Sequence, residues 1–513
     1  MKKKNVYIIS SIFAALLMIF SVTGAAITEN KSIKPVDKED FDPLVDIEVT
    51  VDIKAIRSLE KRDTQVHRIE KIDWLSDPDF YVRVTINGAE FISDIWNNTK
   101  YIYDLEWSAT ADVPDDEPWV NITIQLWDWN PKTDRLCDIS TAYYDEDYED
   151  TFDVELWYNI QSGHWYGDDS SGALSWYGDT SGYGRLNGCD DGSIYQRDRD
   201  CELWFDITQT DYDGDGIPYW AEVNHHETDP EVDNTGEDND GDGIPIEWEH
   251  KWGHWMYTWH GEVHHGWDYD DLEWDDHEHL DPDDDGIENI EEYWMSEWGS
   301  DPYRADVFVE MDRMADSPDG FENNLPEGSK ELLRTAFNRQ NVVYHLDDGC
   351  MGGGNEIIPF MEMVGRNELD QMYNNYFLHG DPNNWRQGIF RYGLVVYQAD
   401  VNGYVFNQDA YQISANGMEE KVLPNTQKKR DVVYASAYMH ECGHTFDFNP
   451  IGGHDLDSYY PWQKGWWKWR PYKSCMNYGY MYTTVDYSDG SRGKNDFDDW
   501  DRIDFTSFQE SWG

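Results

Sequence analysis

Short runs of alternating apolar and polar residues dominate the chain from about residue 40 to residue 207. In "VDIEVTVDI", "FYVRVTI", "VNITIQLWDW" and "ELWFDI", apolar side chains recur at every second position. Clusters of Asp, Asn, Pro and Gly separate these runs. A period of two is typical of strands that bury one face, and such clusters mark turns. The pattern therefore predicts an N-terminal all-β sandwich over residues 40–207.

From residue 301 onward, predicted strands and helices are interleaved. "ADVFVEMDRM", "NVVYHL" and "YGLVVYQA" are predicted to be strands, and "KELLRTAFNRQ" is predicted to be a helix. A second helix is expected in "DVVYASAYMHECGHTF", with Asp431 as its N-cap. Its apolar residues recur at steps of three and four, which gives one buried face: Val432, Ala435, Met439, Cys442 and Phe446. We therefore predict a C-terminal α/β domain over residues 301–513.

The N-terminus has the composition of a secretory signal. Three lysines precede an uncharged apolar run over residues 6–22, and Gly24, Ala25 and Ala26 follow it. We expect residues 1–26 to be a signal peptide, with an uncleaved anchor as the alternative. No later segment is apolar enough to cross a bilayer, so no further membrane span is expected. The protein is therefore predicted to be secreted or extracellular, either free or associated with the cell surface.

The charge of the chain is strongly negative. Asp and Glu number 104 against 39 Lys and Arg, which gives a net charge of -65. Such a surface repels nucleic acid and anionic membranes, so neither is expected as a partner. A high-salt habitat, many bound divalent cations, or both would account for the charge. The aromatic content of 15% excludes a disordered acidic tail.

Three acidic segments of one plan lie within residues 208–300: "DYDGDGIPYWAE", "DNDGDGIPIEWE" and "DPDDDGIENIEE". Each has Asp at positions 1, 3 and 5, Gly at 6, Ile at 7 and Glu at 12. Calcium prefers six to eight oxygen ligands, and this spacing wraps carboxylates around one point. The segments resemble thrombospondin type 3 and dockerin-like calcium loops. We predict three calcium sites, with these ligands: Asp211, Asp213, Asp215 and Glu222; Asp238, Asp240, Asp242 and Glu249; Asp281, Asp283, Asp285 and Glu292.

Two stretches of the predicted sandwich are also acidic. "DWLSDPDF" contains Asp73, Asp77 and Asp79, and "DWNPKTDRLCD" contains Asp128, Asn130, Asp134 and Asp138. They resemble the end loops of the synaptotagmin-type calcium and lipid sandwich, which share calcium between such carboxylates. Ordinary Asp-rich turns are the preferred interpretation, with shared calcium binding as the alternative.

Histidines and cysteines offer further candidates. Nine of the 16 histidines fall between His225 and His279, among many Trp and Tyr residues. A packed or solvated helical spacer is the preferred interpretation, with an accessory transition-metal site as the alternative. Six cysteines in an exported chain favour disulfides, and Cys189 with Cys201 is the preferred pair. For Cys442, a buried thiol and a disulfide are equally acceptable.

The segment "HECGHTFDFNPIGGHD", residues 440–455, contains the pattern H-E-x-x-H. On a helix, His440 and His444 lie one turn apart and can share a zinc ion, while Glu441 can act as a general base. A catalytic zinc site needs a third protein ligand. At the position where the common longer motif has that histidine stands Pro450, which cannot bind a metal.

We predict that His454 is the third zinc ligand, reached by a longer loop. A residue before proline is pushed out of the helical region, so the helix must end before Pro450. Two glycines before His454 allow the chain to turn back toward the helix. Asp455 and Asp457 are rival ligands, and Asp455 is alternatively a partner of a ligating imidazole.

A second motif, "SCMNYGY" at residues 474–480, strengthens this interpretation. Together with the H-E-x-x-H pattern and the downstream His, it resembles the metzincin clan of zinc metallopeptidases. The resemblance implies that Met476 lies in a turn beneath the metal and that Tyr478 approaches the metal or the substrate oxyanion. The region from about Asp301 onward also resembles uncharacterised archaeal exported proteins with the same "FVE-D" strand, H-E-x-x-H pattern and "GGHD".

These features predict an exported, calcium-stabilised zinc endopeptidase that acts on a peptide or protein substrate and uses Zn²⁺ and Ca²⁺. Glu441 would be the general base and Tyr478 a hydrogen-bond donor to the oxyanion. The segment "WQKGWWKWRPYK" either lines a substrate cleft or forms a packed aromatic platform. The alternative function is a non-catalytic, calcium-dependent adhesion or binding protein with a structural metal site. Such a site has no need of Glu441, which favours the enzyme.

Overall fold

The computed structural model describes residues 41–59, 72, 76–140, 152–170, 182–190, 199–253, 257–259, 262–264, 269, 271–448 and 452–509. The predicted signal peptide, residues 1–26, lies outside these ranges. Among the residues described, no helix combines the length and the apolar composition needed to cross a membrane.

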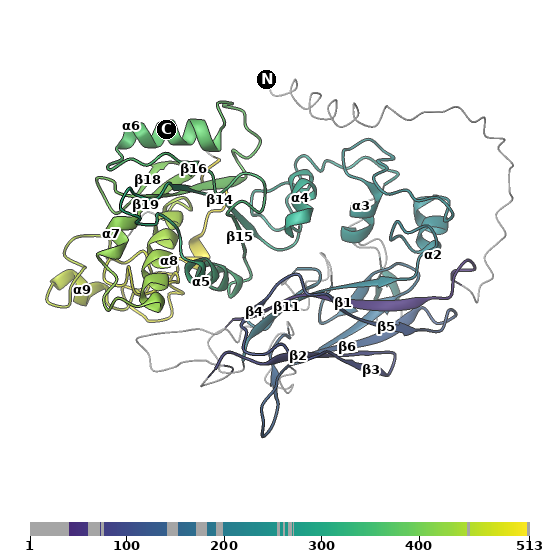
Figure 1. Cartoon of the computed structure of the whole chain (residues 1–513). Coiled ribbons are helices and arrows are strands. Elements are labelled where there is room, and N and C mark those ends of the chain that lie inside the picture. Colours follow the sequence, from purple (N-terminus) through teal and green to yellow (C-terminus); the bar gives the residue numbers. More distant parts are fainter. Residues whose placement is uncertain are drawn as a thin grey trace. The chain divides into compact units, whose positions relative to one another are not determined.

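Two antiparallel sheets occupy the N-terminal part of the described chain (Figure 1). The first has the order β10–β11–β1–β4, with β5 paired to β1: β1 (Glu48–Ser58), β4 (Tyr101–Ile102), β5 (Trp107–Asp112), β10 (Arg185–Asn187) and β11 (Cys201–Gln209). The second has the order β3–β2–β6–β8–β9, with β7 paired to β6: β2 (Phe80–Ile86), β3 (Ala89–Ile92), β6 (Trp119–Asp128), β7 (Arg135–Cys137), β8 (Val154–Asn159) and β9 (Trp165–Gly167).

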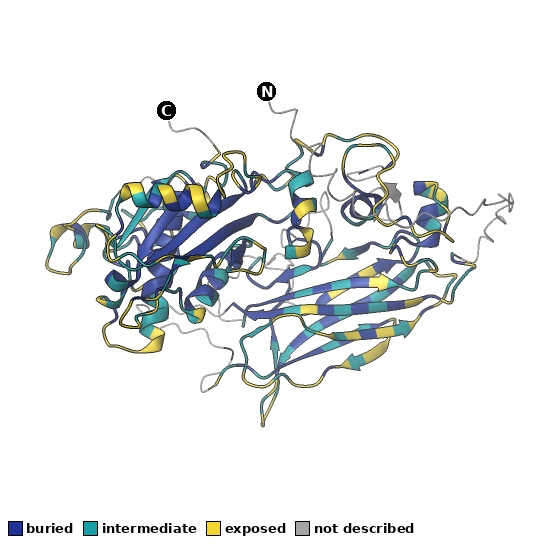
Figure 2. Ribbon diagram, turned by 45° about the horizontal axis from the view of Figure 1, so that its top comes forward, coloured by how far each residue is buried: buried dark blue, intermediate teal, exposed yellow. Residues whose placement is uncertain are grey.

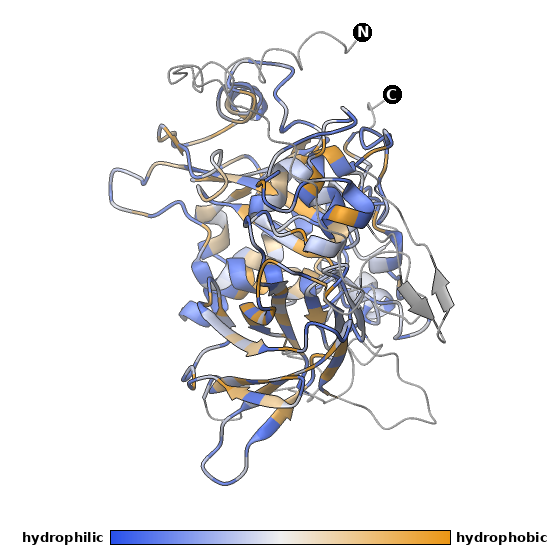
Figure 3. Cartoon of the chain, turned by 90° about the vertical axis from the view of Figure 1, so that its right-hand side faces the viewer, coloured by the Kyte–Doolittle hydropathy of each residue, from blue (hydrophilic) through white to orange (hydrophobic). Residues whose placement is uncertain are grey.

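Alternation along these strands produces one shared core. In β6 every second side chain is buried, among them Val120, Ile122 and Ile124. These pack in the same hydrophobic cluster as Val49 and Val51 of β1, in the other sheet. Hydrophobic and hydrophilic positions accordingly alternate along the strands (Figure 3). Burying one face of each sheet against the other is what a period of two allows.

Short helices follow the three acidic segments. They are α2 (Tyr219–Ala221) with the π-helical turn η2 (Glu222–His226), α3 (Ile246–Trp252), and α4 (Asn289–Met295) with the 3₁₀ turn η3 (Ser296–Trp298). Between α3 and α4, β12 (Tyr257–Trp259) pairs with β13 (Glu262–His264) in an antiparallel hairpin. The helical spacer predicted for this region is therefore wrong at β12 and β13, because residues with strong β propensity such as Tyr, Thr, Trp and Val fill these positions.

A six-stranded mixed sheet follows in the C-terminal part. Its order is β15–β14–β17–β19–β18, with β16 paired to β14. The strands are β14 (Asp306–Met314), β15 (Val343–Asp347), β16 (Ile357–Ile358), β17 (Phe390–Val396), β18 (Gly403–Asn407) and β19 (Ala410–Ser414). Only the β18–β19 pair is antiparallel among these six described strands. Figure 2 shows the central strands buried along their length, unlike the alternating N-terminal strands.

Helices lie on both faces of this sheet (Figure 1). On one face are α5 (Glu327–Asn338) and α8 (Gln427–His444), whose apolar side chains share a cluster with Val307 and Val309 of β14. On the other are α6 (Arg366–Met372) and the π-helical turn η4 (Tyr373–Phe377), which pack with Phe308. The remaining helical segments are α7 (Ala415–Glu419), α9 (Lys464–Trp469) and the 3₁₀ turn η5 (Trp500–Arg502).

The fold class predicted from the sequence is wrong as stated. It combined a sandwich, a calcium-loop region and a C-terminal α/β zinc-peptidase domain. In the described residues β-sheets predominate and helices are few, and residues 301–448 and 452–509 form no clear α/β zinc-peptidase domain. The physical reason is that periodicity fixes which face of a segment is buried, whereas the architecture depends on strand pairing between distant segments.

The helix that carries His440 also differs from its prediction. It begins at Gln427, and its N-cap is Thr426, whose hydroxyl accepts a hydrogen bond from Lys429 N at 3.3 Å. Asp431 lies one turn inside the helix. The helix has no single apolar face, because side chains from Val433 onward are buried on nearly all sides by the sheet and the C-terminal loops.

The six cysteines are free thiols. The predicted disulfide between Cys189 and Cys201 is therefore wrong. Cys189 lies in a turn and Cys201 begins β11, and the Cys189 thiol instead donates a hydrogen bond to Asp200 Oδ2 at 3.5 Å. Cys442 is a fully buried thiol on α8, which is one of the two alternatives for this residue.

Candidate metal centre

Three histidine rings converge at the C-terminal end of α8. One ring nitrogen from each of His440, His444 and His454 lies within 4.8 Å of the other two. The Nε2 atoms of His440 and His454 are 3.2 Å apart. The His440 and His454 rings are parallel at 5.1 Å, and the His444 ring stands perpendicular to both. The structure thus brings together the three residues that the sequence singles out as zinc ligands.

The turn at residues 474–478 fixes two of these three histidines. The carbonyl of Cys475 lies 2.8 Å from His440 Nδ1, so this nitrogen carries the proton and donates it. The backbone N–H of Tyr478 donates to the carbonyl of Gly453, immediately before His454, at 3.0 Å. Gly453 has φ +82, and an added Cβ would lie 2.8 Å from the Asn477 side chain. The glycine therefore serves both the turn and the close approach.

Met476 lies directly against the metal-site helix. A Cβ on Gly443 would stand 2.7 Å from Met476 Sδ. Met476 itself is fully buried. The glycine within the H-E-x-x-H pattern therefore lets the turn pack under α8, next to His444.

The loop that carries His454 rests on an aromatic side chain. A Cβ on Gly452 would lie 2.2 Å from the Trp469 ring, so the glycine packs directly on the indole. Trp462 and Trp467 of the same aromatic segment are exposed, at 78% and 59%. Part of the segment thus supports the site and part faces solvent. Residues 449–451, which include Pro450, lie outside the described chain.

Asp455 and Asp457, the two alternatives to His454 as the third zinc ligand, accept hydrogen bonds from other residues. Asp455 Oδ1 accepts hydrogen bonds from Asp457 N at 2.9 Å and from Ser458 Oγ at 3.0 Å. Asp457 Oδ2 accepts one from Gly465 N at 2.9 Å. Both carboxylates thus stabilise the loop that follows His454.

Glu441 is buried beside the histidines, with 4% of its surface exposed. Its side chain packs against Gly403, the first residue of β18: a Cβ there would lie 2.0 Å from Glu441 Oε1. Burial raises the pKa of Glu441 to about 8. A carboxyl group with a pKa near neutrality is suited to take up and release a proton. The sequence around Gly403 does not predict this contact, because Gly403 and Glu441 are brought together only by the packing of α8 on the sheet.

Tyr478 lines the same site. Its ring lies 4.2 Å from that of His454 and 5.8 Å from that of His440, measured between centroids. Tyr459 stacks on its other side at 4.7 Å. Burial raises the pKa of the Tyr478 hydroxyl to about 12, so it stays protonated and able to donate a hydrogen bond.

The donor set fits a zinc ion. Burial is the main cause that lowers the pKa of all three histidines, and repulsion between the rings lowers the pKa of His440 and His444 further. The pKa of His440 lies well below its usual value, the pKa of His444 is lowered to about 4, and the pKa of His454 is lowered as well. The three imidazoles are therefore neutral at pH 7, as metal ligands must be. Because His440 Nδ1 carries its proton, its Nε2 has a free lone pair. Zinc–nitrogen bonds of about 2.0–2.1 Å in a tetrahedron place two ligand nitrogens about 3.3 Å apart, close to the separation observed here.

The three acidic segments each gather carboxylates. Single oxygens of Asp211, Asp213 and Glu222 lie within 4.8 Å of one another, as do those of each of two further groups: Asp238, Asp240 and Asp242; Asp281, Asp283 and Asp285. Gly at position 6 has a left-handed backbone in all three segments, with φ between +88 and +105. Position 4 is left-handed as well, occupied by Gly214, Gly241 and Asp284, a requirement that the sequence pattern had not revealed.

Burial explains the remaining features of the acidic segments. Ile at position 7 is buried in each: Ile217, Ile244 and Ile287. Burial raises the pKa of Asp215 to about 6 and that of Glu222 to about 9. Burial also raises the pKa of Glu292 well above its usual value, and the nearby Asp306, Asp285 and Asp283 raise it further. A divalent cation would relieve the repulsion between these carboxylates, which fits calcium as the ligand.

The two acidic stretches of the N-terminal sheets come together only in part. The backbone N–H of Asp79 donates to Asp128 Oδ1 at 3.1 Å, and Asn130 N donates to Asp134 Oδ1 at 3.0 Å. Asp138 lies elsewhere, in a bridge with Asp200. Asp77 lies in the loop before β2, where its carboxylate is 3.9 Å from Lys100 Nζ, and Asp73 lies outside the described residues.

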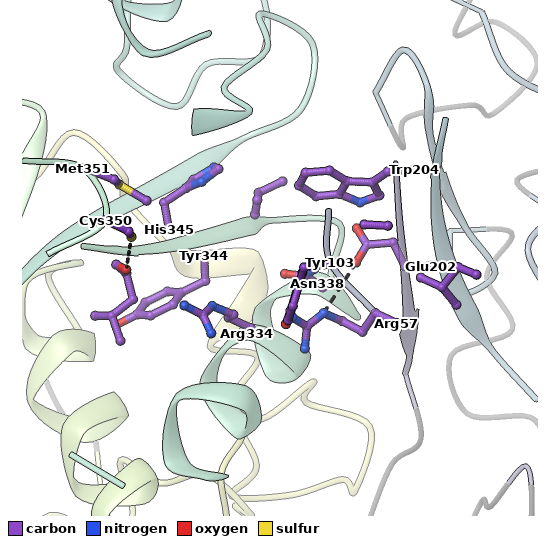
Figure 4. A pocket seen from close by; sticks show the side chains of 14 residues that line it. Arg57, Tyr103, Glu202, Trp204, Arg334, Asn338, Tyr344, His345, Cys350 and Met351 are labelled. Carbon is purple, nitrogen blue, oxygen red and sulfur yellow. Dashed lines mark hydrogen bonds and ion pairs between the residues drawn. The ribbon is translucent and has the colours of Figure 1, made fainter. Parts of the chain in front are cut away.

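A separate pocket lies between the first sheet and the C-terminal sheet (Figure 4). Its lining includes Arg57, Glu202, Tyr344 and His345. Arg57 forms ion pairs with Glu202 and with Glu331. None of the three clustered histidines lines it, so this pocket is distinct from the candidate metal centre.

Comparison with known proteins gives no family for this chain. No family model and no curated protein matches it. Among solved structures, a C2 domain is 13% identical at a TM-score of 0.14 and covers 18% of this chain and 71% of its own. Human GIVD cytosolic phospholipase A2 is 14% identical at a TM-score of 0.18, and the match covers 32% of this chain and 16% of the phospholipase. A tandem of C2 domains from Extended-Synaptotagmin 2 is 12% identical at a TM-score of 0.18, and the match covers 37% of this chain and 47% of the tandem. This chain thus spans less than half the length of the last two, and likenesses at such TM-scores carry no argument about fold or function.

Proposed function

We propose that the protein is an exported zinc-dependent endopeptidase whose fold is stabilised by calcium. The observation that carries this proposal is the convergence of three neutral imidazoles, from His440, His444 and His454, beside a buried glutamate that binds none of them. A structural zinc site has no use for such a glutamate. A peptide bond is the preferred substrate because the donor set and the base have the roles required for hydrolysis of an amide.

The residues of the site have distinct roles in this proposal. A zinc ion held by the three histidines would supply Lewis-acid polarisation of a substrate carbonyl. Glu441 would take a proton from the attacking water on a carboxylate oxygen and pass it to the leaving amine. The Tyr478 hydroxyl, protonated at neutral pH, would donate a hydrogen bond to the oxygen of the substrate carbonyl as negative charge develops there. Cys475 O would hold His440 in the tautomer that presents Nε2.

Calcium enters the proposal through the acidic segments. Their clustered carboxylates repel one another, and a cation that binds only the folded loops stabilises the folded state. Export is supported by the predicted signal at residues 1–26, and the substrate would then be an extracellular peptide or protein.

The test is hydrolysis of casein or gelatin by the full-length protein, with and without a zinc chelator. The variant Glu441→Gln should keep zinc, as measured by metal mass spectrometry, and lose hydrolysis. The matched control is Glu420→Gln, which changes an exposed carboxylate at the end of α7 and should retain the parent rate.

Two outcomes would count against the enzyme. Full hydrolysis by zinc-loaded Glu441→Gln would remove the proposed base. Absence of any hydrolysis by zinc-loaded parent protein on casein, gelatin and a peptide library would favour the non-catalytic binding protein.

A further inference from the structure

The three acidic segments share one way of closing. In each, the aspartate at position 5 accepts a hydrogen bond on Oδ1 from the backbone N–H of the isoleucine at position 7. Its Oδ2 accepts a second one from a backbone N–H far downstream, at Asn234, Asp275 and Asp306 respectively. Each segment is therefore folded against a later stretch of chain, and the three copies can be compared position by position.

The copies differ in what the later stretch offers to the glutamate at position 12. In the first, the Thr228 hydroxyl donates to Glu222 Oε1 at 3.2 Å. In the third, the Ser300 hydroxyl donates to Glu292 Oε2. In the second, an imidazole occupies this place: His277 Nε2 lies 3.8 Å from Glu249 Oε1 and 3.4 Å from Asp242 Oδ2.

The second copy leaves buried polar atoms without partners. His277 is fully buried and Glu249 is 1% exposed. Apart from the contacts of 3.4 and 3.8 Å between His277 Nε2 and the two carboxylates, neither oxygen of Glu249, nor His277 Nε2, has a hydrogen-bond partner. Single atoms of Asp242, Glu249 and His277 lie within 4.8 Å of one another. Buried polar atoms without partners cost free energy, and a cation among them would satisfy all three side chains at once.

The other ring nitrogen of His277 is compatible with metal binding through Nε2. Nδ1 lies 3.0 Å from Asn289 Nδ2, while Asn289 Oδ1 has no partner. Turning the Asn289 amide by half a rotation lets Oδ1 accept the proton of Nδ1, since the two amide orientations occupy the same space. Nε2 then carries a lone pair directed at the two carboxylates.

We propose that the second segment is a transition-metal site in which Asp242, Glu249 and His277 bind a first-row divalent cation, unlike the oxygen-only first and third segments. Imidazole nitrogen favours ions such as manganese or zinc over calcium, which prefers oxygen ligands. Asp238 and Asp240, whose carboxylates gather with Asp242, complete the ligand set. The cation would link Glu249 of α3 to His277 further along the chain. Calcium would link each of the other two acidic segments in the same way to the helix that follows it.

The experiment measures manganese binding to the full-length protein with calcium in excess, by the loss of the free-ion electron paramagnetic resonance signal. It is run in a His454→Ala background, so that the histidine cluster on α8 contributes no strong manganese site. One manganese ion should remain bound. The variant His277→Ser gives the second segment a hydroxyl like that of Ser300 in the third segment, and it should weaken manganese binding at least about tenfold. The control His279→Ser removes an exposed ring two residues away and should change nothing.

A spectroscopic measurement covers the case in which His277→Ser fails to fold. In the His454→Ala protein, bound manganese should show the electron spin-echo modulation of one directly coordinated imidazole nitrogen. Absence of this coupling, displacement of manganese by calcium, or unchanged manganese affinity in folded His277→Ser would each overturn the proposal.

Discussion

Replacing Gly403 by alanine tests the position of the proposed base without changing any metal ligand. The new Cβ would stand 2.0 Å from Glu441 Oε1, 2.7 Å from Cδ and 2.9 Å from Cγ. The glycine does not have a left-handed backbone, so alanine is acceptable to the strand itself. The three atoms nearest to the new Cβ therefore all belong to the Glu441 side chain.

The size of the effect follows from these distances. Ordinary contact begins at 3.4 Å, so going from 2.0 to 3.4 Å requires the carboxylate or the strand to move by about 1.4 Å. Glu441 is almost completely buried and has little free space to move into. A misplacement of about 1 Å in a catalytic group costs about 100-fold in rate, or about 2.7 kcal/mol. We expect kcat/KM to fall by about that factor.

The assay is cleavage of a fluorogenic peptide, paired with zinc content by metal mass spectrometry. Gly403→Ala should remain zinc-loaded, because the atoms nearest to the new Cβ belong to Glu441 and not to a histidine. The control Gly365→Ala brings a Cβ only to the flexible end of Glu368, at 3.0 Å, and should keep the parent rate. Parent activity in folded, zinc-loaded Gly403→Ala would refute the reasoning, whereas loss of zinc would show that the change acts on the metal site.

Three further predictions concern stability. Asp213→Ala should lower the melting temperature in calcium but not in chelator, by the equivalent of about 2.7 kcal/mol at a calcium concentration 100 times Kd. The control Glu231→Ala, at an exposed carboxylate, should not lower it. If Asp213→Ala and the parent melt at the same temperature in calcium, the first segment does not bind calcium. Burial lowers the pKa of His164 to about 4, so the folded state resists protonation and stability is lost as pH falls from about 6.5 to about 4. Chemical denaturation of His164→Asn should show about 3 kcal/mol less loss over this window than the parent, and an equal loss in the two proteins would contradict this. Arg304→Met should destabilise the fold by about 3 kcal/mol, because buried Glu202 loses the nearer of its two cations, Arg304 at 2.7 Å, and keeps only Arg57 at 3.8 Å; a loss below about 1 kcal/mol would contradict this.

Features set by local geometry could be predicted from the sequence. The spacing of His440 and His444 places them on one side of a helix whatever surrounds it, because 3.6 residues make one turn. The repeated register of Asp, Gly and Ile in the acidic segments determines a loop with left-handed glycines and a buried isoleucine. Alternation in β1, β2, β6 and β11 marks their buried faces without reference to their partners.

Features that depend on distant contacts could not be predicted. Glu441 meets Gly403 only because α8 packs on β18, and His277 meets Glu249 only because a downstream stretch closes the second segment. Asp431 is a good N-cap residue, yet the helix extends one turn further, where Thr426 caps it and Arg430 pairs with Glu419 on α7. The sequence by itself thus determined which residues can bind metal and how each local turn is shaped. Only the tertiary structure decided how the strands pair, which glycine packs against Glu441 and which acidic segment lies next to His277, because these depend on packing between segments far apart in the chain.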